Sequence, residues 1–67
     1  MPVIVFEGRK LTKEQKEELI RGFTDLAQRV TGLPREAFTV FIKENELDNI
    51  GVGGEPLSRR LKNQGSR

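Results

Sequence analysis

Pro2 is the first residue of this sequence whose type and place could do chemistry. It stands beside the initiator methionine and opens an apolar run, Val3-Ile4-Val5-Phe6. Initiator methionine is usually cleaved when the next residue is small, and cleavage would turn the Pro2 nitrogen into a secondary amine. An apolar site disfavours the charged form of an amine, so its pKa falls toward neutrality. A neutral amine can act as a general base.

Pro2 also has a purely structural interpretation. Proline is tolerated at the first residue of a strand because no amide N–H is needed there. On this interpretation the chain is a non-catalytic oligomeric module.

Composition narrows the chemistry that is available. The chain has no histidine and no cysteine. Disulfides, zinc–sulfur sites and Ser-His triads are therefore excluded. A base that works near neutral pH must be Asp, Glu, Lys or an N-terminal amine.

The elements that would position Pro2 form a βαβ pattern. The first strand is expected over residues 3–6, followed by a loop over 7–11, and the second strand over residues 38–44. One helix lies between the strands, so the strands are expected to be parallel and the crossover right-handed.

The helix is expected to begin at Thr12, because Thr12 and Gln15 match a capping box. It should stop near Thr31, with Gly32 as its C-cap. Apolar residues between these limits recur at helical spacing and predict one buried face. They are Leu19, Ile20, Phe23, Leu26, Ala27 and Val30.

The end of the chain is predicted to hold a tight hairpin and a basic tail. Three glycines within Ile50–Gly54 favour a β-hairpin. We therefore expect an α/β (α+β) fold with a C-terminal β-hairpin, divided into a domain over residues 1–57 and a tail over 58–67.

The net charge of +2 comes from the tail. Residues 58–67 hold four basic and no acidic side chains, whereas residues 1–57 hold eight basic and ten acidic ones. The chain has neither Trp nor Tyr, so a nucleic-acid partner has little support. No membrane span or signal peptide is visible, and a cytoplasmic protein is the default expectation.

The chain is too short to be stable without reinforcement. Small scaffolds use disulfides, metals or oligomerisation, and composition leaves only the last. The open apolar edges of a two-stranded sheet are pairing sites. We expect a homo-oligomer built from dimers, each with a four-stranded sheet and two helices on one face.

Several segments together carry a resemblance to a known family. They are the Pro2 strand, Glu7-Gly8-Arg9, the helical EQKEELI stretch, the VFIKE strand and the GVGG hairpin. Over roughly residues 2–57 the chain resembles the 4-oxalocrotonate tautomerase family. The resemblance implies a βαβ subunit, usually in a homohexamer, with Met1 removed and Pro2 as the catalytic general base.

The resemblance also implies the reaction. It is an isomerase activity, the enol–keto tautomerisation of a small 2-hydroxydienoate or enolpyruvate-type acid. The Pro2 amine would take the proton from the enol and return it to a different carbon. One amine moves one proton, so no cofactor and no metal is expected.

The cation that binds the substrate carboxylate has two candidates. Arg9, in Glu7-Gly8-Arg9, resembles the family's carboxylate-binding arginine. A regular strand, however, puts Lys10 and not Arg9 on the same face as Pro2. We leave both open as substrate-binding residues.

Two further positions depart from the family pattern. Thr39 stands where the best-studied members carry an arginine that polarises the substrate, and Lys43, on the same strand face by period 2, is a candidate substitute. Ile50 stands where those members place a phenylalanine around the proline, which keeps the site apolar.

A related proline-dependent dehalogenase or decarboxylase is the alternative enzyme class. Hydration of a haloacrylic acid needs a carboxylate that activates water. No acidic residue in the sequence is clearly placed for that role.

Overall fold

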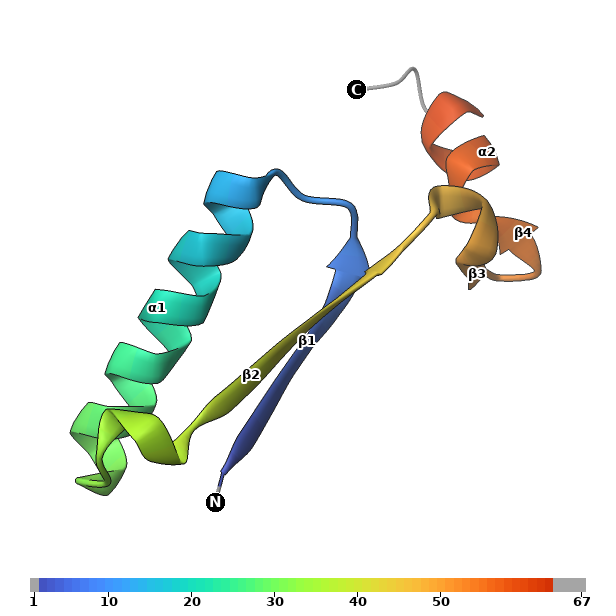
Figure 1. The fold of residues 1–67 in the computed structure, drawn as a ribbon. Helices are drawn as coiled ribbons and strands as arrows, with labels where there is room; N and C mark the ends of the chain where they lie inside the picture. The colour runs from blue at the N-terminus through green and yellow to red at the C-terminus, as the bar shows by residue number, and fades with distance from the viewer. Residues whose placement is uncertain (1, 64–67) are drawn as a thin grey trace.

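The computed structural model describes residues 2–63 (Figure 1). Met1, whose removal would free the Pro2 amine, and residues 64–67 of the predicted basic tail lie outside the described residues. The elements in chain order are β1 (Val3–Arg9), α1 (Lys13–Thr31), the 3-10 helix η1 (Arg35–Ala37), β2 (Thr39–Asn45), the 3-10 helix η2 (Leu47–Asn49), β3 (Gly51–Val52), β4 (Glu55–Pro56) and α2 (Leu57–Asn63).

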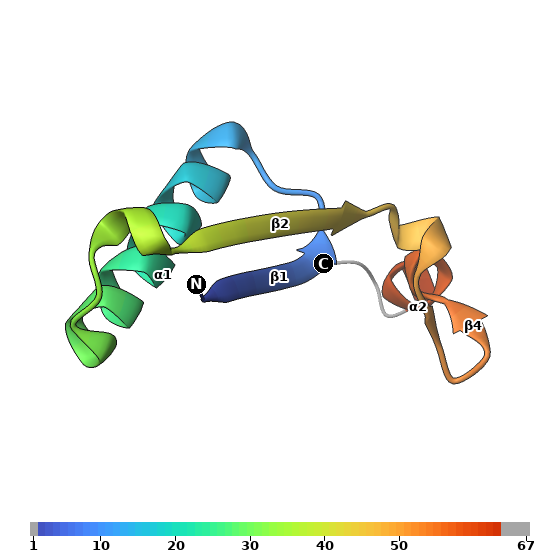
Figure 2. The same ribbon diagram turned by 60° about the horizontal axis from the view of Figure 1, so that its bottom comes forward.

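The centre of the fold is a parallel pair of strands with one helix across it. β1 and β2 pair in parallel from Val3 opposite Thr39 to Arg9 opposite Asn45. Figure 2 shows α1 on one face of this sheet, with the other face uncovered. The predicted βαβ unit with parallel strands is confirmed.

The first strand is longer than the sequence predicted. Residues 7–9 were expected in a loop, but β1 continues through Arg9. The extension follows from pairing, because every residue from Glu7 to Arg9 has a register partner on β2. The Asn45 side-chain amide also donates a hydrogen bond to Glu7 at 3.1 Å. Tertiary pairing here overrides the low strand preference of Glu and Gly.

Both predicted ends of α1 are confirmed. The Thr12 hydroxyl accepts a hydrogen bond from the Gln15 N–H at 3.1 Å, and the Gln15 side chain accepts one from the Thr12 N–H at 3.0 Å. At the other end Gly32 has a φ of 76°. This left-handed conformation costs a residue with a Cβ roughly 1–2 kcal/mol.

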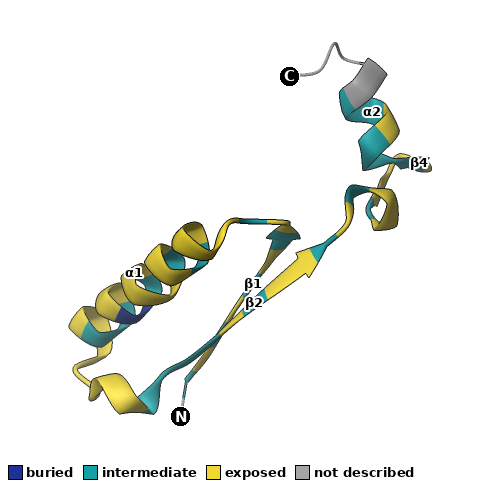
Figure 3. Ribbon diagram, turned by 45° about the horizontal axis from the view of Figure 1, so that its top comes forward, coloured by how far each residue is buried: buried dark blue, intermediate teal, exposed yellow. Residues whose placement is uncertain are grey.

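Packing between α1 and the sheet is thin. The rings of Phe6 and Phe23 lie 5.9 Å apart and hold the helix to β1. Thr24 is the one buried residue in the described part of the chain, and it has no fully buried apolar neighbour (Figure 3). The single chain therefore lacks a core of its own.

Half of the residues on the predicted apolar face of α1 are half-buried, and the other half are exposed to solvent. Leu19, Phe23 and Ala27 are half-buried. The other three of the predicted set are 41–73% exposed, namely Ile20, Leu26 and Val30. The helix carries a wider apolar surface than this sheet can cover.

The last third of the described chain forms an arm beyond the carboxyl end of β2 (Figure 1). The predicted hairpin is confirmed as the antiparallel pair β3–β4, with Gly53 and Gly54 both at positive φ in its turn. The helix α2 that follows was not predicted. A hydrogen bond between Ser58 and Asp48 ties it to η2.

Within residues 2–63, no helix has both the length and the apolar character that crossing a membrane requires.

Substitution of Gly32 tests the C-cap. Gly32→Ala is expected to lower the free energy of unfolding by about 1 kcal/mol, because alanine is strained at positive φ. Thermal denaturation at constant protein concentration measures the change. Gly32→Asn is the control and should lose less, since asparagine tolerates this conformation. An alanine variant as stable as the wild type would contradict the assignment.

Candidate active site

Pro2 lies at the amino end of the sheet, directly before β1. It is half-buried, and its carbonyl oxygen accepts a hydrogen bond from the Thr39 N–H at 3.1 Å. Thr39 is the first residue of β2. The backbone of Pro2 is therefore held against the start of the second strand.

The candidate cations lie at the opposite end of the sheet. Arg9 is the last residue of β1, and Lys10 follows it in the short linker to α1. Seven residues separate Pro2 from Arg9, which at the rise of a strand is about 23 Å. A small carboxylic acid cannot bridge that span, so one chain does not bring these residues together.

Lys43 and Ile50 are also remote from Pro2. Lys43 and Thr39 are four residues apart in a strand whose register with β1 is unbroken, so Lys43 shares a strand face with Thr39. It lies four residues farther along, about 13 Å. Ile50 follows η2 in the arm, beyond the carboxyl end of β2, where its carbonyl oxygen accepts the Leu57 N–H at 2.7 Å.

Glu44, which no sequence pattern indicated, forms two contacts at the carboxyl end of the sheet, where Arg9 and Lys10 lie. One oxygen of Glu44 accepts a hydrogen bond from the Leu11 N–H at 3.0 Å and lies 3.2 Å from the Lys16 ammonium. The Leu11 N–H, and then Lys16, hold the pKa of Glu44 below its usual value. No local motif signals Glu44, because both partners come from across the fold.

A small cavity of about 140 Å³ lies beside this carboxylate. Its lining consists of Lys10, Glu44, Asn45 and Glu46. A predicted site residue, Lys10, thus lines this cavity.

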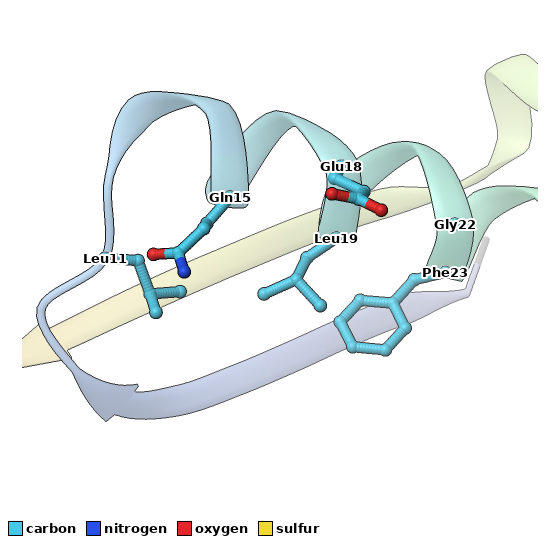
Figure 4. A pocket seen from close by; sticks show the side chains of 6 residues that line it. All are labelled: Leu11, Gln15, Glu18, Leu19, Gly22 and Phe23. Atoms are coloured by element: carbon cyan, nitrogen blue, oxygen red, sulfur yellow. The ribbon is translucent and has the colours of Figure 1, made fainter.

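A larger groove of about 440 Å³ opens along α1 (Figure 4). It is lined by Leu11, Gln15, Glu18, Leu19, Gly22 and Phe23. None of the predicted site residues lines it. The side chains of Leu11, Leu19 and Phe23 make it largely apolar, which suits a packing surface better than an anion site.

The match to known proteins identifies the family. The family model described as Tautomerase enzyme matches residues 2–60, almost the whole described chain. The chain belongs to the tautomerase family. It is therefore an enzyme of the isomerase class, and the non-catalytic module is set aside.

Individual relatives agree with this assignment. The chain is 40% identical over 55 residues to a 2-hydroxymuconate tautomerase of Pseudomonas putida, covering 82% of this chain and 84% of the relative. A solved apo, unfused 4-oxalocrotonate tautomerase superposes with a TM-score of 0.80 at 33% identity, covering 88% of this chain and 98% of the other.

A dehalogenase-related structure is also similar. A solved structure described by its trans-3-chloroacrylic acid dehalogenase activity superposes with a TM-score of 0.72 at 33% identity. The match covers 84% of this chain and 98% of the other. The tautomerase-like fold predicted from the sequence is confirmed by these structures.

The lowered pKa of Glu44 predicts a pH dependence of stability. A carboxylate with a depressed folded-state pKa stabilises the fold above its unfolded value, about 4.5. That contribution disappears as the pH falls through the lower folded-state pKa. Glu44→Gln should therefore have a lower melting temperature than the wild type at neutral pH, and the difference should shrink below about pH 4.5. A difference that is constant down to strongly acidic pH would contradict this role.

Proposed function

We propose that this enzyme catalyses the enol–keto tautomerisation of a small 2-hydroxydienoate or enolpyruvate-type acid, with the Pro2 amine as general base. The observation that carries the proposal is the placement of Pro2. It is half-buried and directly precedes a strand, with its carbonyl held by the Thr39 N–H. Removal of Met1 would leave a secondary amine at a defined point at the start of β1, next to Val3.

The active site is completed by a second copy of the chain. Within one chain the strand length separates Pro2 from Arg9 and Lys10 by more than a small acid can span. Among residues 2–63, β1 is hydrogen-bonded to β2 alone, so its other edge is open to pairing. Antiparallel pairing of two β1 strands about a two-fold axis puts the Pro2 of one copy beside the β1 end of the other.

Strand symmetry favours Lys10 as the cation nearest to Pro2. Residues directly opposite in an antiparallel pair point to the same face. A two-fold axis normal to the sheet therefore pairs residues of the same parity, and Pro2 comes opposite Gly8 or Lys10. The side chain of Arg9 points to the other face at the same end. A cation there would bind the distal carboxylate and stabilise charge that develops on the substrate.

The remaining candidates lie around this arrangement. Thr39 lies beside Pro2 in the same chain, and Lys43 lies on the sheet face that points away from α1. The arm that carries Ile50 extends past the carboxyl end of β2, the end where the second copy's Pro2 would lie. Ile50 would then form an apolar wall for a neighbouring site.

The exposed apolar surface supports assembly into a homo-oligomer. Val3, Val5 and Phe41 lie on the uncovered sheet face and are each 50–56% exposed. The groove along α1 is a second apolar surface, on the helix side of the sheet. The family resemblance favours a hexamer built from dimers.

The dehalogenase alternative rests on the similarity to a structure with that activity. It needs a carboxylate that is free to activate water. Glu44 is bound to Leu11 and Lys16, and Glu7 accepts a hydrogen bond from Asn45. Turnover of 3-chloroacrylate faster than that of an enol acid would favour this alternative.

The base is tested by Pro2→Ala. Tautomerisation of 2-hydroxymuconate and of an arylenolpyruvate should fall by about a hundredfold or more, because a positioned general base contributes about that much. Intact mass shows whether Met1 has been removed. Pro34→Ala is the matched control and should retain activity. Equal rates for Pro2→Ala and the wild type would refute the proposal.

Assembly is tested by a charge placed in the middle of β1. Val5→Lys should lower the mass of the particle in solution toward the 7.6 kDa of a single chain, because a charge is costly in an apolar contact. Light scattering with size-exclusion chromatography measures the mass. Glu17→Lys, at an exposed position on α1, is the control. An unchanged mass for Val5→Lys would exclude this face from the interface.

A further inference from the structure

The linker between β1 and α1 is held by side chains. It contains only Lys10, Leu11 and Thr12. The Leu11 N–H donates to Glu44 at 3.0 Å, and the Thr12 N–H donates to the side chain of Gln15 at 3.0 Å. Lys10 is thus followed at once by two anchored backbone groups, which limits the directions that its side chain can take.

Glu44 connects three parts of the fold through one carboxylate. It belongs to β2, its Oε2 binds the linker, and the same oxygen pairs with Lys16 on α1 at 3.2 Å. Its register partner on β1 is Gly8, which has no side chain to stand in the way. The two side chains of the ion pair are 35% and 28% exposed, so water screens the pair only in part.

The ion pair with Lys16 leaves Lys10 available. The described residues contain two ion pairs, Lys16 with Glu44 and Arg35 with Asp25. Lys10 lines the small cavity beside Glu44 but forms neither pair. A carboxylate already neutralised by one lysine competes weakly for a second, so the Lys10 ammonium can bind an anionic ligand.

We infer that Glu44 is a positioning residue for Lys10. It fixes the linker so that the Lys10 ammonium meets the distal carboxylate of a substrate bound at the Pro2 of a second copy. Glu44 itself touches no substrate. The inference rests on the proposed function. It attributes the preference for dicarboxylate over monocarboxylate enol acids to the contacts by which Glu44 fixes the linker.

The test compares two substrates in a double-mutant cycle. Glu44→Ala should raise KM for the dicarboxylate 2-hydroxymuconate by about tenfold with little change in kcat, as expected for lost uniform binding. KM for a monocarboxylate arylenolpyruvate should barely change. In a Lys10→Ala background, Glu44→Ala should add no further increase, because the two residues act as one unit.

Two variants separate positioning from a general loss of structure. Glu44→Gln keeps an acceptor for the Leu11 N–H and should restore most of the dicarboxylate affinity. Asp25→Ala breaks the other ion pair, on α1 away from the linker, and should change neither KM. If Glu44→Ala fails to fold, Glu44→Asp keeps the charge with a shorter reach and should show the same split in KM.

The outcomes distinguish this inference from the proposed function. Additive effects of Lys10→Ala and Glu44→Ala, or equal changes in KM for both substrates, would overturn the role of Glu44. If Pro2→Ala abolishes activity in the same experiments, the proposed function survives that result. If Pro2→Ala is as active as the wild type, the proposed function is refuted, and the inference about Glu44 is refuted with it.

Discussion

The parallel pairing of β1 with β2 is the constraint on which the rest of the structure depends. It runs unbroken from Val3 to Arg9 and from Thr39 to Asn45. Because β1 lies between them in the chain, Pro2 at its start and Arg9 and Lys10 at its end are a full strand length apart. A single chain can position a base or bind a carboxylate, but it cannot do both at one point. In the proposed dimer, antiparallel pairing of two β1 strands would remove the separation, because it places the start of one strand beside the end of the other.

The same surfaces account for stability and for function. Several apolar side chains of the described chain are about half exposed, among them Val3, Val5, Leu26 and Phe41. Covering each would contribute roughly 1 kcal/mol. The sum is comparable with the whole stability of a small domain, about 5 kcal/mol. In our proposal, assembly supplies the core that the chain lacks and also completes the active site.

Local signals were read correctly from the sequence because short-range chemistry determines them. The capping box at Thr12, the left-handed Gly32 and the glycine turn at Gly53 and Gly54 each depend on residues within a few positions. The extension of β1 through Arg9 depends on a partner strand more than thirty residues away, so local preference misplaced it. The helix α2 was missed for a similar reason, since it packs on η2 through Ser58 and Asp48.

The residues of the candidate site show the same difference between features set by nearby residues and features set by distant ones. The sequence alone indicates Pro2 as a candidate residue by its type and position. It does not indicate Glu44, because Leu11 and Lys16 contact Glu44 only in the folded chain. The strand parity that favours Lys10 over Arg9 was also legible. What parity alone did not reveal is that both cations lie about 23 Å from the Pro2 of their own chain.

Subunit complementation tests the central claim most directly. Pro2→Ala subunits and Arg9→Ala/Lys10→Ala subunits are unfolded together, refolded as a mixture and assayed with 2-hydroxymuconate at low concentration. If each site takes its base from one copy and its cation from another, random pairing rebuilds one intact site in each mixed dimer. The mixture should then recover about a quarter of the wild-type activity. No activity beyond the sum of the two separate variants would show that each site is built within one chain.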